Sequence, residues 1–299
     1  MDTDRSETIE LPDGGYGIVD MGNRNVSSKD IRTVFEDNHL LVVEKPPNML
    51  TQGDHTGDGD MLTALKEYIR QKYNKPGNVY LGLVHRLDRP AGGVMVFAKT
   101  SRAASRLSDQ MRTGAFGKTY LAVVHGVPDK LSGTLVNYLI KDEATNIVKA
   151  VDVPYSEGSS RALHNNEGNS RAHPIRAHSN NEGGLRAHPN NEGSSGIHVA
   201  NMPANAKKAV LDYEARSTAD GLTLVQIRLR TGRPHQIRVQ FAAIGHPLYG
   251  DQKYGATLNR PGEQLALWAA GITFIHPTLK EPVSFNSDPP SAYPWSLFK

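Results

Sequence analysis

The sequence predicts an α+β domain built on a mixed, largely antiparallel sheet. Strand patterns outnumber helix patterns, and short loops join most of them, which does not require the strands to be parallel. The hydrophobic fraction of 38% and the charged fraction of 22% are typical of globular proteins, so most of the chain should fold. By length alone, the 299 residues could form one large domain or two small ones.

Each expected element has a local signal. Strands are predicted where apolar residues run together, and helices where they recur every three or four positions. A proline and two glycines prevent a regular element across residues 85–93. Ser101 is expected to cap the second helix and Gly114 to end it. The predicted strands are 39–44, 80–84, 94–98, 119–125, 210–217 and 222–230, and the predicted helices are about 61–73, 101–113 and 234–244.

The third helix has the most informative pattern. Pro234 suits its first position, and Ile237, Phe241 and Ile244 recur at i, i+4 and i+7 to form a buried face. This places Arg238 away from the apolar stripe. The segment 230–233 (RTGR) brings two arginines to the helix N-terminus and predicts a phosphate or carboxylate site there, although an exposed basic helix start explains it equally well.

One segment interrupts the pattern of short loops. Near-copies RALHNNEG, RAHSNNEG and RAHPNNEG begin at positions 161, 176 and 186, so they keep no fixed spacing and contain hardly any large apolar residue. Such a segment cannot build a core. We therefore predict a disordered, low-complexity repeat insertion at about 156–200. Its five histidines allow a zinc-binding interpretation, which their irregular spacing disfavours.

Composition excludes several classes of protein. Cysteine is absent, which excludes disulfides and thiol chemistry and fits a reducing compartment. There is no run of about 18 apolar residues, the minimum for a membrane helix. Residues 1–30 carry seven acids against three bases, net −4, whereas a secretory signal is basic and then apolar. We expect a cytoplasmic protein that does not enter a membrane.

The charge distribution is uneven. The net charge of +3 is too small to indicate nucleic-acid binding by itself. Residues 85–120, however, carry seven bases against two acids, a local excess of +5. This excess suits a phosphate backbone, and a solvated basic helix face is the plainer explanation.

The segment 85–93 (HRLDRPAGG) holds a candidate catalytic carboxylate. Asp88 lies between basic residues on a turn that follows a predicted strand, so neighbouring positive charge favours its ionised form. A persistent carboxylate can act as a nucleophile or a base. Alternatively, an aspartate in such a turn only accepts hydrogen bonds from loop amides.

Taken together, the motifs resemble the RluA family of pseudouridine synthases. The family's HRLD signature matches residues 85–93, and its TGR-x-HQIR signature matches 231–238. Nearly the whole chain outside residues 1–30 and the insertion is covered. Further matching motifs in order are EKPPNML at 44–50, GKTYLAVVHG at 117–126, GHPLYGD at 245–251 and LALWAAGITFIHP at 265–277.

The resemblance implies the pseudouridine synthase fold, no metal or organic cofactor, and isomerisation of uridine within RNA. It makes Asp88 the essential aspartate and Arg238 the arginine that pairs with it. Tyr120 matches the tyrosine that stacks on the target base, and Arg86 the arginine that fills the space left by the extruded uridine, since the reacting bond is inaccessible inside a stack. RNA contacts are expected from Arg86, Arg89, Lys118, Arg233 and His235.

The sequence departs from the family pattern at four positions. Ala91 and Gly92 replace a common Thr-Ser pair, which predicts a less rigid catalytic turn. Trp268 and Gln240 replace histidines and are expected to alter the RNA-facing surface. Many relatives begin with a basic RNA-binding domain, whereas here an acidic extension, residues 1–30, precedes a catalytic domain at 31–299.

The leading hypothesis is an RNA pseudouridine synthase that isomerises specific uridines in rRNA or tRNA as a monomer. No nucleotide cofactor is expected, because neither a GxxxxGK[ST] loop nor a Rossmann fingerprint is present. The alternative is a noncatalytic RNA-binding or ribosome-assembly protein that keeps the fold. The motifs do not distinguish between target RNAs.

Overall fold

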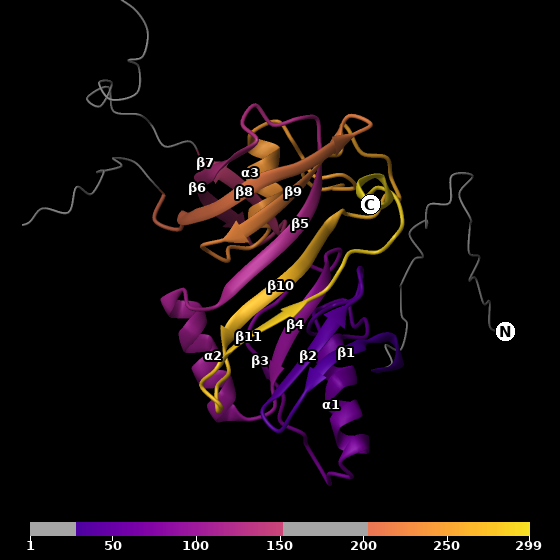
Figure 1. Ribbon diagram of the computed structural model, residues 1–299, viewed down its shortest axis with the longest axis vertical. Coiled ribbons are helices and arrows are strands. Elements are labelled where there is room, and N and C mark those ends of the chain that lie inside the picture. The colour runs from indigo at the N-terminus through magenta and orange to yellow at the C-terminus, as the bar shows by residue number, and fades with distance from the viewer. Residues whose placement is uncertain (1–27, 152–202) are drawn as a thin grey trace, which may run out of the picture. The chain divides into compact units, whose positions relative to one another are not determined.

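The computed structural model describes residues 28–151 and 203–299 (Figure 1). Most of the acidic extension and the whole repeat insertion, including its histidines, lie outside the described residues. The helices are α1 (Met61–Lys72), α2 (Ser101–Thr113) and α3 (Gln236–Ala243), with 3-10 turns η1 (Ser28–Asp30) and η2 (Trp295–Phe298). The strands are β1 (Arg32–Glu36), β2 (Leu40–Lys45), β3 (Gly82–Leu83), β4 (Gly92–Ala98), β5 (Gly117–His125), β6 (Ser132–Asp142), β7 (Ile147–Val151), β8 (Lys207–Ala219), β9 (Leu222–Leu229), β10 (Leu267–Ile275) and β11 (Pro282–Asn286).

The described strands form one mixed sheet of 11 strands in the order β1-β2-β4-β10-β5-β9-β8-β6-β7, with β11 on β10 and β3 on β4. Only β4 and β10 pair in parallel. All other pairs are antiparallel, so the predicted α+β class with a largely antiparallel sheet is confirmed. Figure 1 shows β5 and β10 running through the middle, with β1–β4 on one side and β6–β9 on the other.

Two hydrophobic clusters cover opposite faces of the sheet. Successive strand residues point to opposite faces, and on β4 Met95 and Phe97 join one cluster while Val94 and Val96 join another. Helices α1 and α3 pack in the first cluster, together with Leu87 from the HRLD segment. Helix α2 packs in the second. The candidate catalytic segment therefore lies on the face that carries α1 and α3.

Local boundaries differ from the predictions in instructive ways. The strand predicted at 80–84 is reduced to β3. Helix α2 is capped by Thr100 and not by Ser101, because the Thr100 hydroxyl accepts from the amide of Ala103. Gly114 ends α2 with a left-handed backbone, as expected. Strands β1, β6, β7, β10 and β11 were not among the predicted elements, and their pairing with neighbours is what defines them.

Helix α3 was predicted at 234–244 and is shorter than that. It begins at Gln236, because His235 adopts a left-handed conformation with φ of 51° and forms the cap. It is also buried on most sides, so the distinction between an apolar stripe and a polar face fails: Arg238 is buried, whereas Ile244 is 38% exposed. A helix that is covered all round gives no reliable amphipathic pattern.

Candidate active site

The turn that carries Asp88 is held by its backbone. Every carbonyl oxygen from residue 87 to residue 91 accepts a hydrogen bond. The Thr51 hydroxyl donates to the oxygen of residue 87, and the Gln264 amide donates to that of residue 90. The amide of Ala91 closes the turn on the oxygen of Asp88 at 3.0 Å. The remaining two oxygens, those of Arg89 and Ala91, accept hydrogen bonds from Lys45.

Lys45 is a fully buried lysine beneath the turn. Its Nζ donates to the carbonyl oxygens of Arg89 at 2.9 Å and Ala91 at 2.7 Å, and to that of Pro46 at 3.1 Å. Burial lowers the Lys45 pKa from its ordinary value to about 7, although the charge of Asp88 opposes the shift. Three backbone carbonyls, buried or partly buried, thus accept hydrogen bonds from one side chain.

Two of the departures from the family pattern meet beneath this turn. Gly92 and Trp268 face each other across the parallel β4–β10 pair. A Cβ atom on Gly92 would lie 2.2 Å from the Trp268 ring, so the ring occupies the space of a side chain at position 92. Trp268 is buried, and its indole N–H donates to Ser287. The prediction that Trp268 alters the RNA-facing surface was wrong.

Gln240, the other replaced histidine, is also buried and does not reach that surface. Its side-chain amide donates to Asn137 on β6. The expected loss of turn rigidity is not seen either, because backbone hydrogen bonds and the packed ring replace the missing hydroxyls of Ala91 and Gly92.

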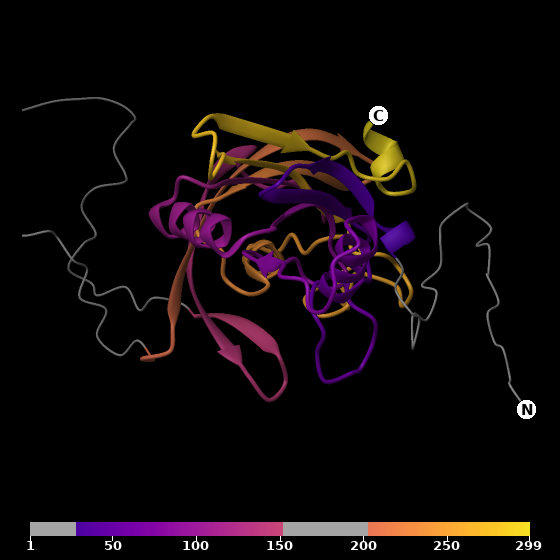
Figure 2. The ribbon, with the colours of Figure 1, turned by 90° about the horizontal axis from the view of Figure 1, so that it is seen from below.

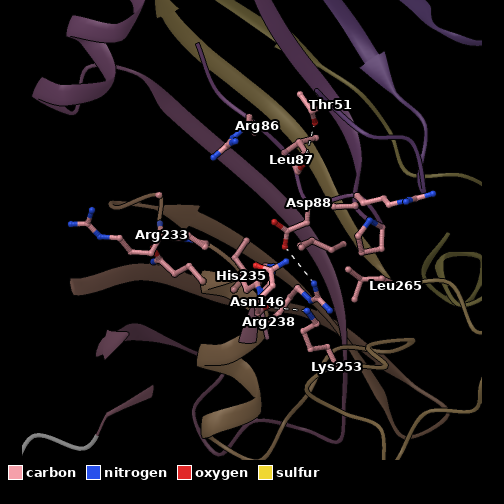
Figure 3. A pocket seen from close by; sticks show the side chains of 18 of the residues that line it. Thr51, Arg86, Leu87, Asp88, Asn146, Arg233, His235, Arg238, Lys253 and Leu265 are labelled. Carbon is pink, nitrogen blue, oxygen red and sulfur yellow. Dashed lines mark hydrogen bonds and ion pairs between the residues drawn. The ribbon is translucent and has the colours of Figure 1, made fainter. Parts of the chain in front are cut away.

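Arg238 faces Asp88 from α3. Its Nη1 lies 3.5 Å from Asp88 Oδ2, close enough for an ion pair. The side chain of Asp88 is 28% exposed and that of Arg238 is 7% exposed. The two groups that the sequence placed in separate motifs are therefore adjacent, and the carboxylate remains accessible. Figure 3 shows both side chains and the ion pair between them.

The stronger partner of Arg238 is Asp251, which the sequence reasoning assigned no role. The Nε and Nη2 groups of Arg238 donate to the two Asp251 oxygens at 2.8 and 2.7 Å. Asp251 also accepts from the amides of Lys253 and Tyr254, which fixes the following turn. Burial lowers the pKa of Arg238, but the carboxylates of Asp251 and Asp88 outweigh this effect and raise it above its ordinary value. The guanidinium lies 5.1 Å from the centre of the Tyr254 ring.

Tyr120 lies on β5 and lines the same cleft as Asp88. Its side chain is buried, and its hydroxyl has no hydrogen-bond partner among residues 28–151 and 203–299. Burial, and secondarily the charge of Asp88, raise the Tyr120 pKa. The phenol therefore stays neutral at physiological pH and offers a ring and a hydroxyl to the cleft.

These groups lie in a cleft of about 1420 Å³. Its walls come from the catalytic turn, from the 51–55 loop and from the tip of the β6–β7 hairpin, residues 143–146. Figure 2 shows this hairpin projecting from the sheet. Lys253 Nζ donates to the Asn146 carbonyl and the amide of Val148 donates to the Tyr254 hydroxyl, so the hairpin is anchored beside Asp251.

The candidate RNA contacts divide into free and engaged cations. Arg86 is exposed at the cleft and has no partner among the described residues. Lys118 lines the cleft, and burial lowers its pKa. Arg89 is engaged, with Asp58 at 2.7 Å and with the Asn48 carbonyl. Arg86 is therefore unengaged among the described residues, Lys118 lies 5.7 Å from the centre of the Phe116 ring, and Arg89 holds the loop.

Arg233 and His235 also line the cleft. The Arg233 Nε donates to the Lys208 carbonyl, which leaves its outer nitrogens available. The anion site predicted at the start of α3 is partly occupied by the protein, because the Gln236 side chain accepts from the Arg233 amide and Arg230 pairs with Asp212.

The basic excess of residues 85–120 is only partly directed at the cleft. Lys99 is paired with Glu36, and both side chains are 7% exposed. Arg106 donates to the Pro277 carbonyl, and Arg112, which does line the cleft, pairs with Asp109. The expectation that the whole stretch grips RNA was therefore too broad.

Among the residues that the structure describes, no group of three or more acidic or histidine side chains is arranged to hold a metal ion. None of the helices in that part of the chain has the length and apolarity needed to cross a bilayer.

The comparison with solved structures identifies the fold. The chain is similar to human RNA Pseudouridylate Synthase Domain Containing 4, with a TM-score of 0.62 and 19% identity over 87% of this chain and 88% of that one. It is also similar to human RNA Pseudouridylate Synthase Domain Containing 1, with a TM-score of 0.57 and 20% identity over 89% and 86%. The architecture is thus that of a pseudouridine synthase domain.

The comparison of sequences gives the family. The model of the RNA pseudouridylate synthase family matches residues 39–243. Ribosomal large subunit pseudouridine synthase D of Zymomonas mobilis is 30% identical over 272 residues, covering 87% of this chain and 69% of that protein. RNA pseudouridine synthase YjbO of Bacillus subtilis is 29% identical over 260 residues, covering 86% and 72%. The chain belongs to the RNA pseudouridylate synthase family, whose members are isomerases that act on RNA.

Proposed function

We propose that this chain converts specific uridines to pseudouridine in structured RNA, ribosomal or transfer RNA, by base flipping and an Asp88-dependent exchange of the glycosidic bond. The observation that carries the proposal is the accessible Asp88 carboxylate beside the fixed Arg238 guanidinium, at the bottom of an open cleft. We further propose that the protein acts as a monomer in the cytoplasm.

The reaction needs only groups that this site supplies. The bond from ribose C1′ to uracil N1 breaks, a bond from C1′ to C5 forms, C5 loses a proton and N1 gains one. Neither an oxidant nor an external energy source is consumed. Asp88 acts as the nucleophile or base, and the Tyr120 ring offers a surface on which the extruded base stacks.

Base flipping accounts for the arrangement of the cations. Asp88 lies inside the cleft, so a uridine must leave its stack to reach it. Arg86 and Lys118, on the same cleft, are placed to hold the flanking backbone or to fill the vacated space. Arg233 extends this surface on the α3 side.

The test uses RNA from a strain that lacks the gene. The purified protein is incubated with this RNA, and pseudouridines are mapped chemically. Wild type should restore specific sites, and Asp88→Ala should restore none. Glu214→Ala, an exposed carboxylate on β8 outside the cleft, is the control and should behave as wild type. Equal restoration by wild type and Asp88→Ala, or none by either, contradicts the proposal.

The noncatalytic alternative rested on a loosened turn at Ala91 and Gly92. Since all five carbonyls of residues 87–91 are bonded, the structure gives that alternative no specific support.

A further inference from the structure

His235 combines an unusual backbone with an unassigned side chain in the cleft. It is the residue before α3, and its φ of 51° is a left-handed conformation that a residue with a Cβ rarely adopts. Its side chain gives no capping hydrogen bond to the helix. Strained residues of this kind persist where the surrounding structure fixes them, often at functional sites. The strain here directs the imidazole toward the cleft.

Hydrogen bonding determines which ring nitrogen carries the proton. His235 Nδ1 lies 2.6 Å from the Tyr254 hydroxyl oxygen. That oxygen already accepts from the amide of Val148 at 2.9 Å. In the described residues, Nδ1 is the only acceptor within reach of the Tyr254 proton. We therefore assign the hydroxyl as the donor to Nδ1, which places the proton of the neutral ring on Nε2.

In the described part of the chain, the only hydrogen bond of the His235 ring is the one through Nδ1, and the ring lines the same cleft as Asp88. His235 and Arg238 both contact Tyr254, and both line the cleft together with Asp88, where Figure 3 labels all three. The imidazole therefore lies near the proposed catalytic pair.

The charge state of the ring agrees with this geometry. Burial lowers the His235 pKa below its ordinary value, and Arg238 and Lys253 act in the same direction. Asp88 and Asp251 oppose the shift, and Tyr254 is the remaining titratable neighbour. The imidazole is consequently neutral at physiological pH, and its tautomer is set by Tyr254.

On the basis of the proposed function, we propose that His235 donates a hydrogen bond from Nε2 to a carbonyl oxygen of the flipped uracil and stabilises the negative charge that develops there as the glycosidic bond breaks. When the bond from C1′ to N1 breaks, its electron pair stays with the base and spreads from N1 onto the carbonyl oxygens. A fixed donor at such an oxygen favours the transition state over the bound substrate. His235 would then be a catalytic residue, and Tyr254 a positioning residue.

The experiment separates the donor from the rest of the imidazole. His235→Gln places an amide N–H near the position of Nε2. His235→Asn tolerates the left-handed backbone and can still bond Tyr254, but has no donor that reaches the cleft. Turnover is measured with RNA labelled with tritium at uracil C5, because this tritium is released when C5 loses its proton. Single-turnover rates are measured with enzyme in excess, and RNA affinity is measured separately.

The proposal predicts that His235→Asn lowers the single-turnover rate by about 100-fold with little change in RNA affinity, as for loss of one such donor. His235→Gln should retain most of the rate, and Tyr254→Phe should fall between the two. Thermal melting should show both His235 variants folded.

Three results would overturn it. If His235→Gln is as slow as His235→Asn, the imidazole transfers a proton instead of donating a fixed hydrogen bond. If His235→Asn weakens RNA binding and flattens its salt dependence while the saturated rate is unchanged, His235 contacts a phosphate. If both variants turn over like wild type, the donor has no role in the reaction. Failure of wild type to release tritium would refute the proposed function itself and not this assignment.

Discussion

The two sides of the Asp88–Arg238 gap are held in opposite ways. On one side, the turn at 87–91 is fixed through its carbonyl oxygens by Lys45 and its neighbours, while the Asp88 carboxylate makes one ion-pair contact at 3.5 Å. On the other side, the Arg238 side chain itself is fixed by two hydrogen bonds to the fully buried Asp251.

This difference fits the roles proposed for the Asp88 carboxylate and the Arg238 guanidinium. A carboxylate that must react needs oxygens free of strong partners, so it is best positioned through its backbone. A guanidinium that only orients a neighbour can be immobilised through its side chain. Arg238 pairs with Asp88, as the resemblance implied, but its bidentate partner is Asp251.

The largest expected effect comes from breaking the side-chain support. Asp251→Asn keeps the size of the group but removes the charge that holds Arg238. We expect a loss of stability of about 3–5 kcal/mol, because a buried guanidinium loses its partner. Turnover should fall roughly 10–100-fold, the size of effect seen when a residue that orients a metal-ligating side chain is removed. Chemical denaturation measures the stability and tritium release measures the turnover, with Glu214→Gln as the control. Unchanged turnover would show that Asp251 does not position Arg238.

The backbone support is tested by Lys45→Met, which keeps an unbranched side chain but removes three donors. We expect a loss of about 2–4 kcal/mol from the unsatisfied carbonyls, with reduced turnover. The pH dependence gives a second check. The Lys45 pKa is about 7 in the folded protein and 10.5 ordinarily, so the unfolded chain binds more protons between these values.

The stability of the wild type relative to Lys45→Met should therefore increase as pH rises from 7 toward 10.5, by up to about 1.4 kcal/mol per pH unit. Denaturation curves at about pH 6, 8 and 9.5 would measure the trend, because the slope is largest between the two pKa values. A difference that is constant across this range would show that the pKa of Lys45 is not lowered in the folded protein.

A smaller effect is expected at Gly92, where the packed Trp268 ring takes the place of a side-chain hydroxyl. The side chain of Gly92→Ser would overlap the space that the Trp268 ring occupies, and we expect a loss of stability of about 1–3 kcal/mol. In a Trp268→Ala background the same change should cost less, because the ring is gone. A double-mutant cycle should show a coupling of about 1 kcal/mol or more. Additive effects would mean that the two positions are independent.

The smallest effect is expected at the partly exposed pair of Arg89 and Asp58. Asp58→Asn should change stability by less than about 1 kcal/mol, since such pairs contribute little. It also releases Arg89 into the cleft. RNA affinity measured at two salt concentrations should therefore rise slightly, with a steeper salt dependence. A large loss of turnover would instead show that the Arg89–Asp58 pair is needed for the reaction.

The sequence predicted the parts of the site that lie in dense motifs. Asp88 and Arg238 were assigned from HRLD and HQIR, and their proximity follows from the structure. Lys45 and Asp251 lay within quoted motifs but received no role. Their partners are backbone oxygens and a side chain distant in sequence, and neither kind of contact leaves a local pattern.

The fold was predicted in the same uneven way. The class was readable, as were strands such as β2 and β5, which are continuous apolar runs, although the central strand β10 was not predicted. Strand β6 alternates exposed and half-buried residues and was missed. Helix α3 was misjudged because tertiary contacts cover most of its surface. Elements whose burial depends on distant neighbours carry the weakest local signal.

The most direct test is a crystal structure of Asp88→Ala. If Arg238 is held by Asp251 independently of Asp88, its guanidinium should keep both hydrogen bonds to Asp251 and should not move when the Asp88 carboxylate is removed. A guanidinium that swings away from Asp251 once the Asp88 carboxylate is removed would contradict the account.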